Sequence, residues 1–429
     1  MGSPTATPGS PAHDRWWLAA AGVITVGWLL VFNPLRPDYL VDEPGHLGNI
    51  YHFLEGKAGW PEAMPMLPGY HFLVAGLWQL HPPLKLLTLA RLVSTVCALL
   101  GLASFALAWR RYHGTPAGPP TLLLALLPVL QPFTGLAYTD APAVAFVLAA
   151  WMAHLAGRYA VAAVIFAAAT CLRQTSLIWA GFVVLWDLSR GVSLREIFTP
   201  RHLAAAWPRL RWLALLGVAA AVTVLTAGRL TVGTGHGNPA TFNPAQIHFA
   251  GWLLLLLGLP LWLRAATNLP RWYADRLRTR TGWTVGGTAL FLGAAVGLAT
   301  TYANPHPWNR DLFWEGCSFT LLRNWPLVWV DRFPVLRCGS GLLLAALAAC
   351  LVAIVRRHPH GRALALTGAA GFVPALISSL VEPRYFIPGL VFGLFFAPLP
   401  PAATRTLLLW WGALVLVHAP FVARGLSLW

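Results

Sequence analysis

Charge is what this sequence has least of. Only 10% of the 429 residues are charged, and just 14 residues are acidic. Lysine is nearly missing, because Lys57 and Lys85 are the only two, so arginine carries almost all of the positive charge. A soluble domain usually has about 25% charged residues, so this composition excludes an ordinary soluble protein. The arginine bias, together with abundant Ala, Leu and Pro, favours a bacterial source with a GC-rich genome.

Cysteine is also scarce. The sequence has five, an odd number, and no Cys-x-x-Cys pair, which excludes a disulfide framework and a zinc knuckle. Cys97 and Cys350 lie in apolar runs and are expected to be small buried residues. Cys317 and Cys338 fall in one predicted outer segment, where a single bridge is an open alternative.

Several motifs of soluble and hydrolytic enzymes are missing. The sequence contains no His-Glu-x-x-His, no Gly-x-Ser-x-Gly, no Asp-x-Asp, no P-loop, no nucleotide-binding glycine motif after a strand and no tandem repeat. The formal net charge of +16 does not indicate nucleic-acid binding, because the arginines flank hydrophobic runs and form no continuous basic stripe. We therefore expect no nucleic-acid partner, and a membrane protease is the least favoured class.

Long hydrophobic runs dominate what remains. The chain is 57% hydrophobic, with a mean hydropathy of +0.62 and 22 Trp. Runs of about 18–22 apolar residues can each cross a hydrocarbon core of about 30 Å as a helix. The sequence predicts an all-α polytopic membrane protein with about 13 transmembrane helices, after a disordered cytoplasmic segment at residues 1–15. Residues 16–429 are predicted to form a single transmembrane domain. The expected spans are 16–35, 88–109, 119–137, 141–157, 159–173, 175–188, 210–227, 248–263, 283–301, 338–355, 363–380, 386–400 and 405–423.

The distribution of charge predicts the orientation. With the N-terminus inside, the inner segments hold 18 of the 30 basic residues and only 4 of the 14 acidic ones, as the positive-inside rule requires. This holds only if residues 65–80 form a short interfacial helix in the first outer loop, 36–87. A full crossing there would put Arg110 and Arg111 outside and abolish the bias. A second outer loop is expected at 302–337.

Five of the acidic residues gather in the first outer loop. They are Asp38, Asp42, Glu43, Glu55 and Glu62. Carboxylates at the edge of a membrane are costly to place and are usually functional. Transfer of a glycosyl group to a hydroxyl needs a carboxylate that removes the hydroxyl proton. Asp42 is the first candidate for this base and Glu43 its competitor; the alternative is that Asp42 is only a solvated helix cap.

His46 follows Asp42 by four residues, which puts both on one face if the segment is helical. This pair is either part of a metal site or, as the missing zincin motif favours, a place where His46 donates a hydrogen bond to a sugar or a carboxylate. We expect no metal and no cofactor.

Two further polar groups lie at the predicted outer ends of later spans. Asp140 follows Tyr138 and Thr139 on the same face of the membrane as Asp42, and an N-cap for the next helix explains it equally well. Arg173, with Gln174 beside it, can hold phosphate oxygens with its planar fork. Snorkelling of Arg173 is the less favoured alternative.

The remaining candidates come from two C-terminal segments. His306 and Arg310 lie in the outer loop 302–337, and Glu382, Arg384 and Tyr385 lie between two late spans. Arg310 can instead pair with a neighbouring acidic residue, and Glu382 with Arg384 as a structural lock. Arginines from three outer segments would form a cationic pocket opposite the acidic one, which suits an anionic leaving group facing a base.

At this point the order of the motifs resembles a known family, the eukaryotic dolichyl-phosphate-glucose-dependent alpha-1,2-glucosyltransferases. These enzymes add the terminal glucose to the lipid-linked oligosaccharide. The segments that carry the resemblance are Val41-Asp42-Glu43-x-x-His46, Glu55-Gly56, Met66-Leu67-Pro68-Gly69-Tyr70, Tyr138-Thr139-Asp140, Leu172-Arg173-Gln174-Thr175 with Trp179, His306-Pro307 before Asn309-Arg310, and Val381-Glu382-x-Arg384-Tyr385.

The resemblance implies the GT-C glycosyltransferase fold, a catalytic Asp or Glu in the first outer loop and a polyprenyl-phosphate sugar donor. The sequence departs from the family at Trp308, where the family has Asp, and at Asp311, where it has His. Glucose specificity and the oligosaccharide acceptor are therefore not carried over. The substrate-binding residues implied are His46, Tyr70, Asp140, Arg173, Gln174, His306, Arg310, Glu382, Arg384 and Tyr385.

The sequence thus predicts an inverting, metal-independent glycosyltransferase of the bacterial inner membrane, active on the periplasmic side. Its donor would be a polyprenyl-phosphate-linked glucose or other hexose, most naturally on undecaprenyl phosphate. Its acceptor would be a hydroxyl of an envelope glycan or lipid. The competing class is a transporter or flippase for a lipid-linked substrate, which is less favoured because the sequence shows no two related halves.

Overall fold

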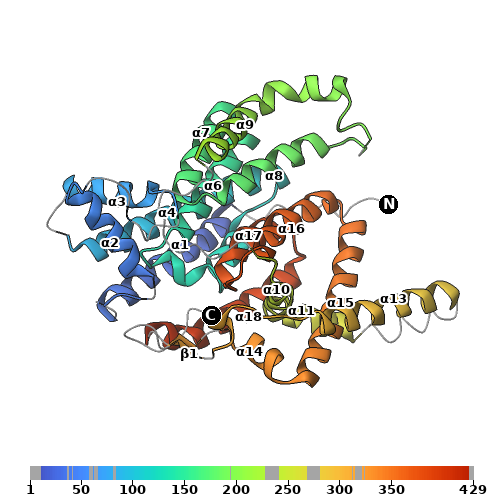
Figure 1. Ribbon diagram of the computed structural model, residues 1–429. Helices are drawn as coiled ribbons and strands as arrows, with labels where there is room; N and C mark the ends of the chain where they lie inside the picture. Colours follow the sequence, from blue (N-terminus) through green and yellow to red (C-terminus); the bar gives the residue numbers. More distant parts are fainter. Residues whose placement is uncertain are drawn as a thin grey trace. The chain divides into compact units, whose positions relative to one another are not determined.

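The computed structural model describes most of the chain as two compact units, residues 1–237 and 238–429 (Figure 1). The prediction of one domain over 16–429 stays a prediction. The residues not described are 1–10, 36–37, 41, 58–60, 62–65, 81–83, 194, 228–240, 268–280, 312, 315–320, 323 and 425–429.

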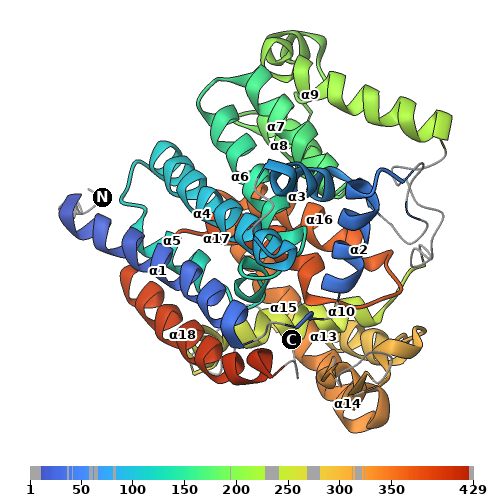
Figure 2. The same cartoon turned by 90° about the vertical axis from the view of Figure 1, so that its left-hand side faces the viewer.

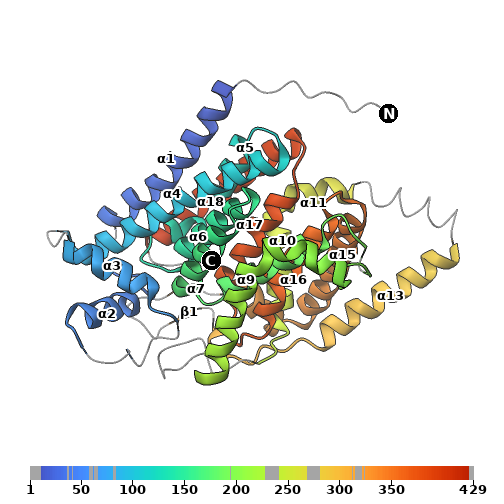
Figure 3. The ribbon, with the colours of Figure 1, turned by 90° about the horizontal axis from the view of Figure 1, so that it is seen from above.

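The first unit is a bundle built around α4 and α6. Its helices are α1 (Pro11–Leu35), α2 (Glu43–Leu54), α3 (Gly69–Leu80), α4 (Leu86–His113), α5 (Gly118–Ala125), η1 (Gln131–Thr134), α6 (Asp140–Leu155), α7 (Tyr159–Leu172), α8 (Ser176–Ser189) and α9 (Pro200–Ala227). Helix α6 packs between α4 and α7, and α1 runs beside α4 and α5 (Figure 3). Helices α7, α8 and α9 pack together, as Figure 2 shows in green.

Small residues bring the helices of this unit close together. A Cβ at Gly101 of α4 would lie 3.0 Å from the Cβ of Ala145 in α6, so the two helices meet where neither has a large side chain. Four helices end at glycines with positive φ: Gly56 after α2, Gly114 after α4, Gly157 after α6 and Gly191 after α8. This left-handed conformation suits glycine and stops each helix there.

The second unit holds α10 (Ala245–Leu257), α11 (Leu259–Ala266), α13 (Thr281–Thr300), η2 (Pro307–Asn309), β1 (Phe313–Trp314), β2 (Leu321–Leu322), α14 (Trp325–Arg332), α15 (Pro334–Arg357), α16 (Gly361–Leu376), η3 (Pro383–Phe386), α17 (Ile387–Phe396) and α18 (Pro401–Ala423). Helix α13 packs on α15, and α16 on α17, where Gly371 and Gly389 bring the backbones into contact. The two short strands pair antiparallel.

The apolar helices confirm a multi-pass integral membrane protein. Among the described residues, five helices are long and apolar enough to cross a bilayer, or six if α10 and α11, which meet at 83°, form one broken span. The predicted span 119–137 is wrong as a continuous helix, because α5 stops at Ala125 and η1 follows separately. Pro128 and Pro132 lie in that stretch and cannot donate helical hydrogen bonds. The count of 13 stays a prediction.

Helix α3 is short, as expected for residues 65–80. Its 12 residues span about 18 Å at 1.5 Å per residue, too little to cross a bilayer of about 30 Å. Its position at a membrane interface stays a prediction. Cys317, a partner in the open disulfide alternative, lies outside the described residues.

Polar clusters lie at both ends of α4. At its C-terminal end, Arg110 pairs with Asp14 at 2.5 Å, and the Asp14 carboxylate also accepts the backbone N–H of Gly118. Residues 11–15 of the segment predicted to be disordered, 1–15, lie in α1, and residues 1–10 lie outside the described part of the chain. Arg91 lies near the other end of α4, about 28 Å away along a helix with a rise of 1.5 Å per residue. That separation matches the thickness of a hydrocarbon core, as the predicted orientation of this helix requires.

Candidate active site

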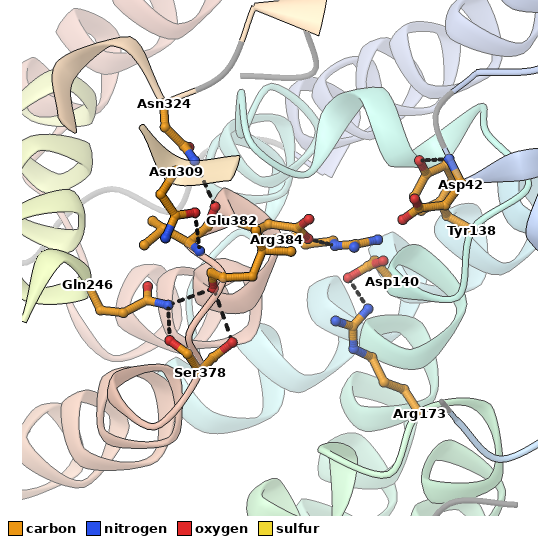
Figure 4. Close-up of polar contacts among 12 residues, drawn as sticks. Asp42, Tyr138, Asp140, Arg173, Gln246, Asn309, Asn324, Ser378, Glu382 and Arg384 are labelled. Atoms are coloured by element: carbon orange, nitrogen blue, oxygen red, sulfur yellow. Dashed lines mark hydrogen bonds and ion pairs between the residues drawn. The ribbon is translucent and has the colours of Figure 1, made fainter. Parts of the chain in front are cut away.

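Asp42 occupies the N-cap position of α2, yet its side chain makes no capping hydrogen bond. The backbone N–H of Asp42 donates to the Tyr138 hydroxyl at 2.9 Å (Figure 4). The segment from Asp42 to His46 is helical, since the N–H of His46 donates to the Asp42 carbonyl at 3.1 Å. The carboxylate is partly buried. The capping alternative therefore does not account for this side chain, although the position is that of a cap.

Glu43, the competing candidate, is completely buried and paired. Arg91, also 0% exposed, reaches it with Nε at 2.9 Å from Oε1 and Nη2 at 2.7 Å from Oε2. The backbone N–H of Leu40 donates to Oε2 at 2.9 Å, and that of Ala137 donates to Oε1 at 2.8 Å. Four donors thus surround the two oxygens, which is the full acceptor capacity of a carboxylate.

This difference separates the two acids chemically. A base must offer an oxygen lone pair to the incoming hydroxyl, and every lone pair of Glu43 already accepts a hydrogen bond. Removing a carboxylate from such a pair leaves a buried arginine uncompensated, which is strongly destabilising. The geometry therefore argues against Glu43 as the base, and the assignment of that role to Asp42 stays a prediction.

His46 forms part of a second buried group. Its Nδ1 lies 3.1 Å from Nε2 of His71, and both rings are almost completely buried. Burial, and then the neighbouring His46, lower the pKa of His71 well below its usual value. Tyr70 is 0% exposed, and its hydroxyl donates to the Ala90 carbonyl at 3.0 Å and lies 3.2 Å from Ser94 Oγ. Tyr70 thus ties α3 to α4, which favours a packing role over a direct substrate contact.

Asp140 and Arg173 form an ion pair that joins the start of α6 to the end of α7 (Figure 4). The N-cap of α6 is Thr139, so Asp140 is the first residue of the helix and the N-cap alternative for Asp140 does not hold. Asp140 Oδ2 is buried and finds no hydrogen-bond partner within the described part of the chain. Arg173 keeps 20% of its side chain exposed, and Gln174 follows it at the same turn. An acceptor atom and a cation are therefore held side by side.

In the second unit, Arg384 pairs with Glu382, as the structural-lock alternative expected (Figure 4). Arg310 is exposed, and its Nε donates to the Asn304 carbonyl at 2.7 Å. His306 and Tyr385 are partly buried. The grouping of these residues with those of the first unit in one pocket stays a prediction.

Asn309 organises the same region of the second unit. It is 0% exposed, accepts the Val381 N–H at 3.0 Å and donates to the Ser379 carbonyl at 2.9 Å. It thereby fixes the loop that carries Glu382 and Arg384. The sequence pointed to the motif that contains Asn309, but it did not predict that Asn309 supports this loop.

Arg91 and His71 are the functional-site neighbours that sequence reasoning missed. Arg91 is a lone arginine at the start of a long apolar helix, which is itself a signal of a buried partner. His71 follows Tyr70 in a short apolar helix and gives a weaker signal. Among the described residues, no group of three or more His, Cys, Asp or Glu side chains could hold a metal ion.

Comparison with known proteins gives one family. The model of the DIE2/ALG10 family matches residues 36–196 of this chain, which confirms the resemblance inferred from the motifs. The matched range includes Asp42, Glu43, Asp140 and Arg173, and it ends before the motifs of the second unit. No curated protein matches the chain.

Comparison with solved structures gives a distant match. The crystal structure of ArnT from Cupriavidus metallidurans bound to undecaprenyl phosphate shares 14% sequence identity, over 97% of this chain and 81% of that one. The TM-score is 0.37, so this likeness does not by itself establish a shared fold.

Proposed function

We propose that this chain is an inverting glycosyltransferase of the GT-C fold that uses a polyprenyl-phosphate-linked sugar as its donor. The observation that carries the proposal is the match of residues 36–196 to the DIE2/ALG10 family, combined with the contrast between Asp42 and Glu43 inside that range. The family points to lipid-linked sugar transfer. Within that range Glu43 is fully buried and accepts four hydrogen bonds, whereas Asp42 is only partly buried.

In the proposed reaction, Asp42 takes the proton of an acceptor hydroxyl. The hydroxyl oxygen forms a bond to the anomeric carbon of the donor as the bond from that carbon to the lipid phosphate breaks. The bonding electrons leave with the polyprenyl phosphate, and a single displacement inverts the anomeric configuration. One base suffices because no covalent sugar–enzyme intermediate is needed.

Arginine would stabilise the departing phosphate. Arg173 is the best placed in the first unit, because it is partly exposed and already oriented by Asp140. Arg310 and Arg384 are the candidates from the second unit. An arginine fork matches two phosphate oxygens at once, and preorganised charge of this kind typically contributes about 10²–10³ in turnover.

The choice of donor lipid and acceptor follows from the expected bacterial source. A bacterial chain would use undecaprenyl phosphate and an envelope glycan or lipid, with glucose or another hexose as the transferred sugar. The active site would lie on the periplasmic side of the inner membrane, where the positive-inside rule places the first outer loop.

The experiment is a transfer assay with the purified full-length protein. It is incubated with a panel of polyprenyl-phosphate hexoses and envelope acceptors, and products are scored by mass and by the anomeric configuration of the new linkage. Nucleotide sugars serve as control donors. We expect transfer from a polyprenyl-phosphate sugar with inversion. Transfer only from nucleotide sugars, or movement of a lipid-linked sugar across proteoliposomes without any transfer, would overturn the proposal, and the second result would favour the transporter class.

A further inference from the structure

The carboxylate of Glu43 connects two loops of the first unit. One loop precedes α2 and ends at Asp42, and the other lies between η1 and α6 and leads to Asp140. The segment that carries Asp42 contacts Glu43 through the Leu40 N–H, and the segment that leads to Asp140 contacts it through the Ala137 N–H. Each oxygen of Glu43 therefore holds one backbone amide from one of the two loops. Asp42 directly precedes Glu43 in the chain, and Asp140 follows Ala137 by three residues.

Arg91 of α4 also bonds to Glu43. Glu43, Arg91 and the amides of Leu40 and Ala137 are together called the joint. Besides its two bonds to Glu43, Arg91 donates from Nη2 to the Asp38 carbonyl at 3.0 Å. One turn further along α4, the Thr95 hydroxyl donates to the Thr134 carbonyl at 2.8 Å. Helix α4 thus contacts both loops, and the guanidinium of Arg91 holds the carboxylate that connects them.

A further bond links the two loops directly. The Asp42 N–H donates to the hydroxyl of Tyr138, and Tyr138 lies between Ala137 and Asp140. The backbone of Asp42 is therefore fixed on both sides, by Tyr138 at its own N–H and by Glu43 at the next residue. The Glu43–Arg91 pair at the centre of these contacts is fully buried, and such a bonded arrangement preorganises the loops before any substrate binds.

From these contacts we infer that Glu43 is a positioning residue, which acts through Arg91 and the Ala137 amide to fix the spacing between Asp42 and Asp140. The inference rests on the proposed function, in which Asp42 is the base and Asp140 orients Arg173. Glu43 itself takes no proton. A displacement of about 1 Å at a reacting group can cost about 10² in rate, so loss of this joint is expected to lower turnover by that order.

The variant must avoid leaving one buried charge alone. Glu43→Gln alone would leave the buried positive charge of Arg91 without its partner. The test therefore uses the double variant Glu43→Gln/Arg91→Met, which removes both charges together. Replacing a buried ion pair with neutral groups of similar volume is often tolerated. The matched control is Asp14→Asn/Arg110→Met, which removes the ion pair at the other end of the same helix α4.

Turnover per folded enzyme, with folded protein counted by donor binding, is the first readout. For the double variant at Glu43 and Arg91 we expect kcat to fall about 10²-fold, with little change in the donor KM. The acid limb of the kcat–pH profile should keep its position, because Asp42 remains the base. The control variant should keep the kcat of the unmodified protein.

Two kinetic outcomes would overturn the inference. Wild-type kcat per folded molecule would mean that the joint is merely structural. Loss of the acid limb of the pH profile would mean that Glu43 itself is the base.

Amide hydrogen exchange gives a second readout that needs no substrate. Peptides covering 38–43 and 134–140 should lose protection together in the double variant and keep it in the control. If the unmodified protein transfers no sugar at all, the proposed function fails, while joint loss of protection would still establish the coupling of the two loops. If only one of the two peptides changes, the coupling is refuted whatever the activity.

Discussion

The imidazoles of His46 and His71 are stacked, with ring centroids 5.3 Å apart and Nδ1 of the first 3.1 Å from Nε2 of the second. They connect α2, which begins beside Asp42, to α3, the short helix of the first outer loop. Burial is the main cause of the low pKa of His71, and the neighbouring His46 lowers that pKa further. His71 is therefore neutral in the folded protein at neutral pH.

The pair predicts a dependence of stability on pH. The unfolded chain binds a proton at His71 below about pH 6.5, whereas the folded protein does not, so folding is disfavoured as the pH falls through that value. One such group contributes a slope of about 1.4 kcal/mol per pH unit. Thermal unfolding of purified protein should show a decline from pH 7 to pH 5 that is shallower in His71→Gln. An unchanged decline in that variant would assign the effect to other groups.

The packing of α3 predicts that alanine is tolerated at Gly76 but not at Gly69. A Cβ on Gly69 would lie 2.7 Å from the backbone carbonyl of Cys171, at the end of α7, which leaves no room without moving α3. A Cβ on Gly76, in the same helix, would meet nothing within 4 Å. We expect Gly69→Ala to destabilise the protein by about 1–3 kcal/mol, and Gly76→Ala to have a neutral or slightly stabilising effect. Equal unfolding temperatures for the two variants would contradict this account of how α3 docks.

Arg173, which pairs with Asp140, is expected to contact the phosphate of the donor lipid. Arg173→Gln should weaken binding of undecaprenyl phosphate and lower kcat by about 10²–10³, because a preorganised charge is lost from the leaving group. Arg158→Gln is the matched control, since Arg158 is the exposed N-cap residue at the other end of the same helix α7. Binding of the lipid phosphate can be measured by native mass spectrometry. If the two variants bind it equally well, Arg173 does not contact the phosphate.

The sequence predicted more of the helices than of their connections. Apolar length located α1, α4, α6, α7, α8, α9, α15 and α18 to within a few residues, apart from an earlier start of α9. It failed at 119–137, because hydropathy does not register that Pro128 and Pro132 interrupt backbone hydrogen bonding. The bend between α10 and α11 was missed for a similar reason, since the two helices together remain apolar enough for one span despite Gly258 and Pro260.

For the candidate site, composition pointed to the first outer loop but not to the different surroundings of its two adjacent acids. Asp42 and Glu43 are adjacent acids, and nothing local distinguishes them. The distinction comes from Arg91, 48 residues further along the chain, and from a backbone amide in the loop before α6. Pairings at such sequence separations depend on how helices pack, which hydropathy and motif spacing do not encode.

The role of Asp42 is the claim on which the rest depends. Asp42→Asn keeps the size of the side chain and the backbone bond to Tyr138, so the variant should fold and bind the donor lipid as before. Asp38→Asn is the control, because Asp38 lies in the same loop with an exposed side chain.

The most direct test is the rate of sugar transfer from a polyprenyl-phosphate donor by Asp42→Asn, measured per molecule of donor-binding protein. The account predicts that transfer is abolished in Asp42→Asn and preserved in Asp38→Asn. Normal turnover by Asp42→Asn would contradict it and remove Asp42 from the role of base.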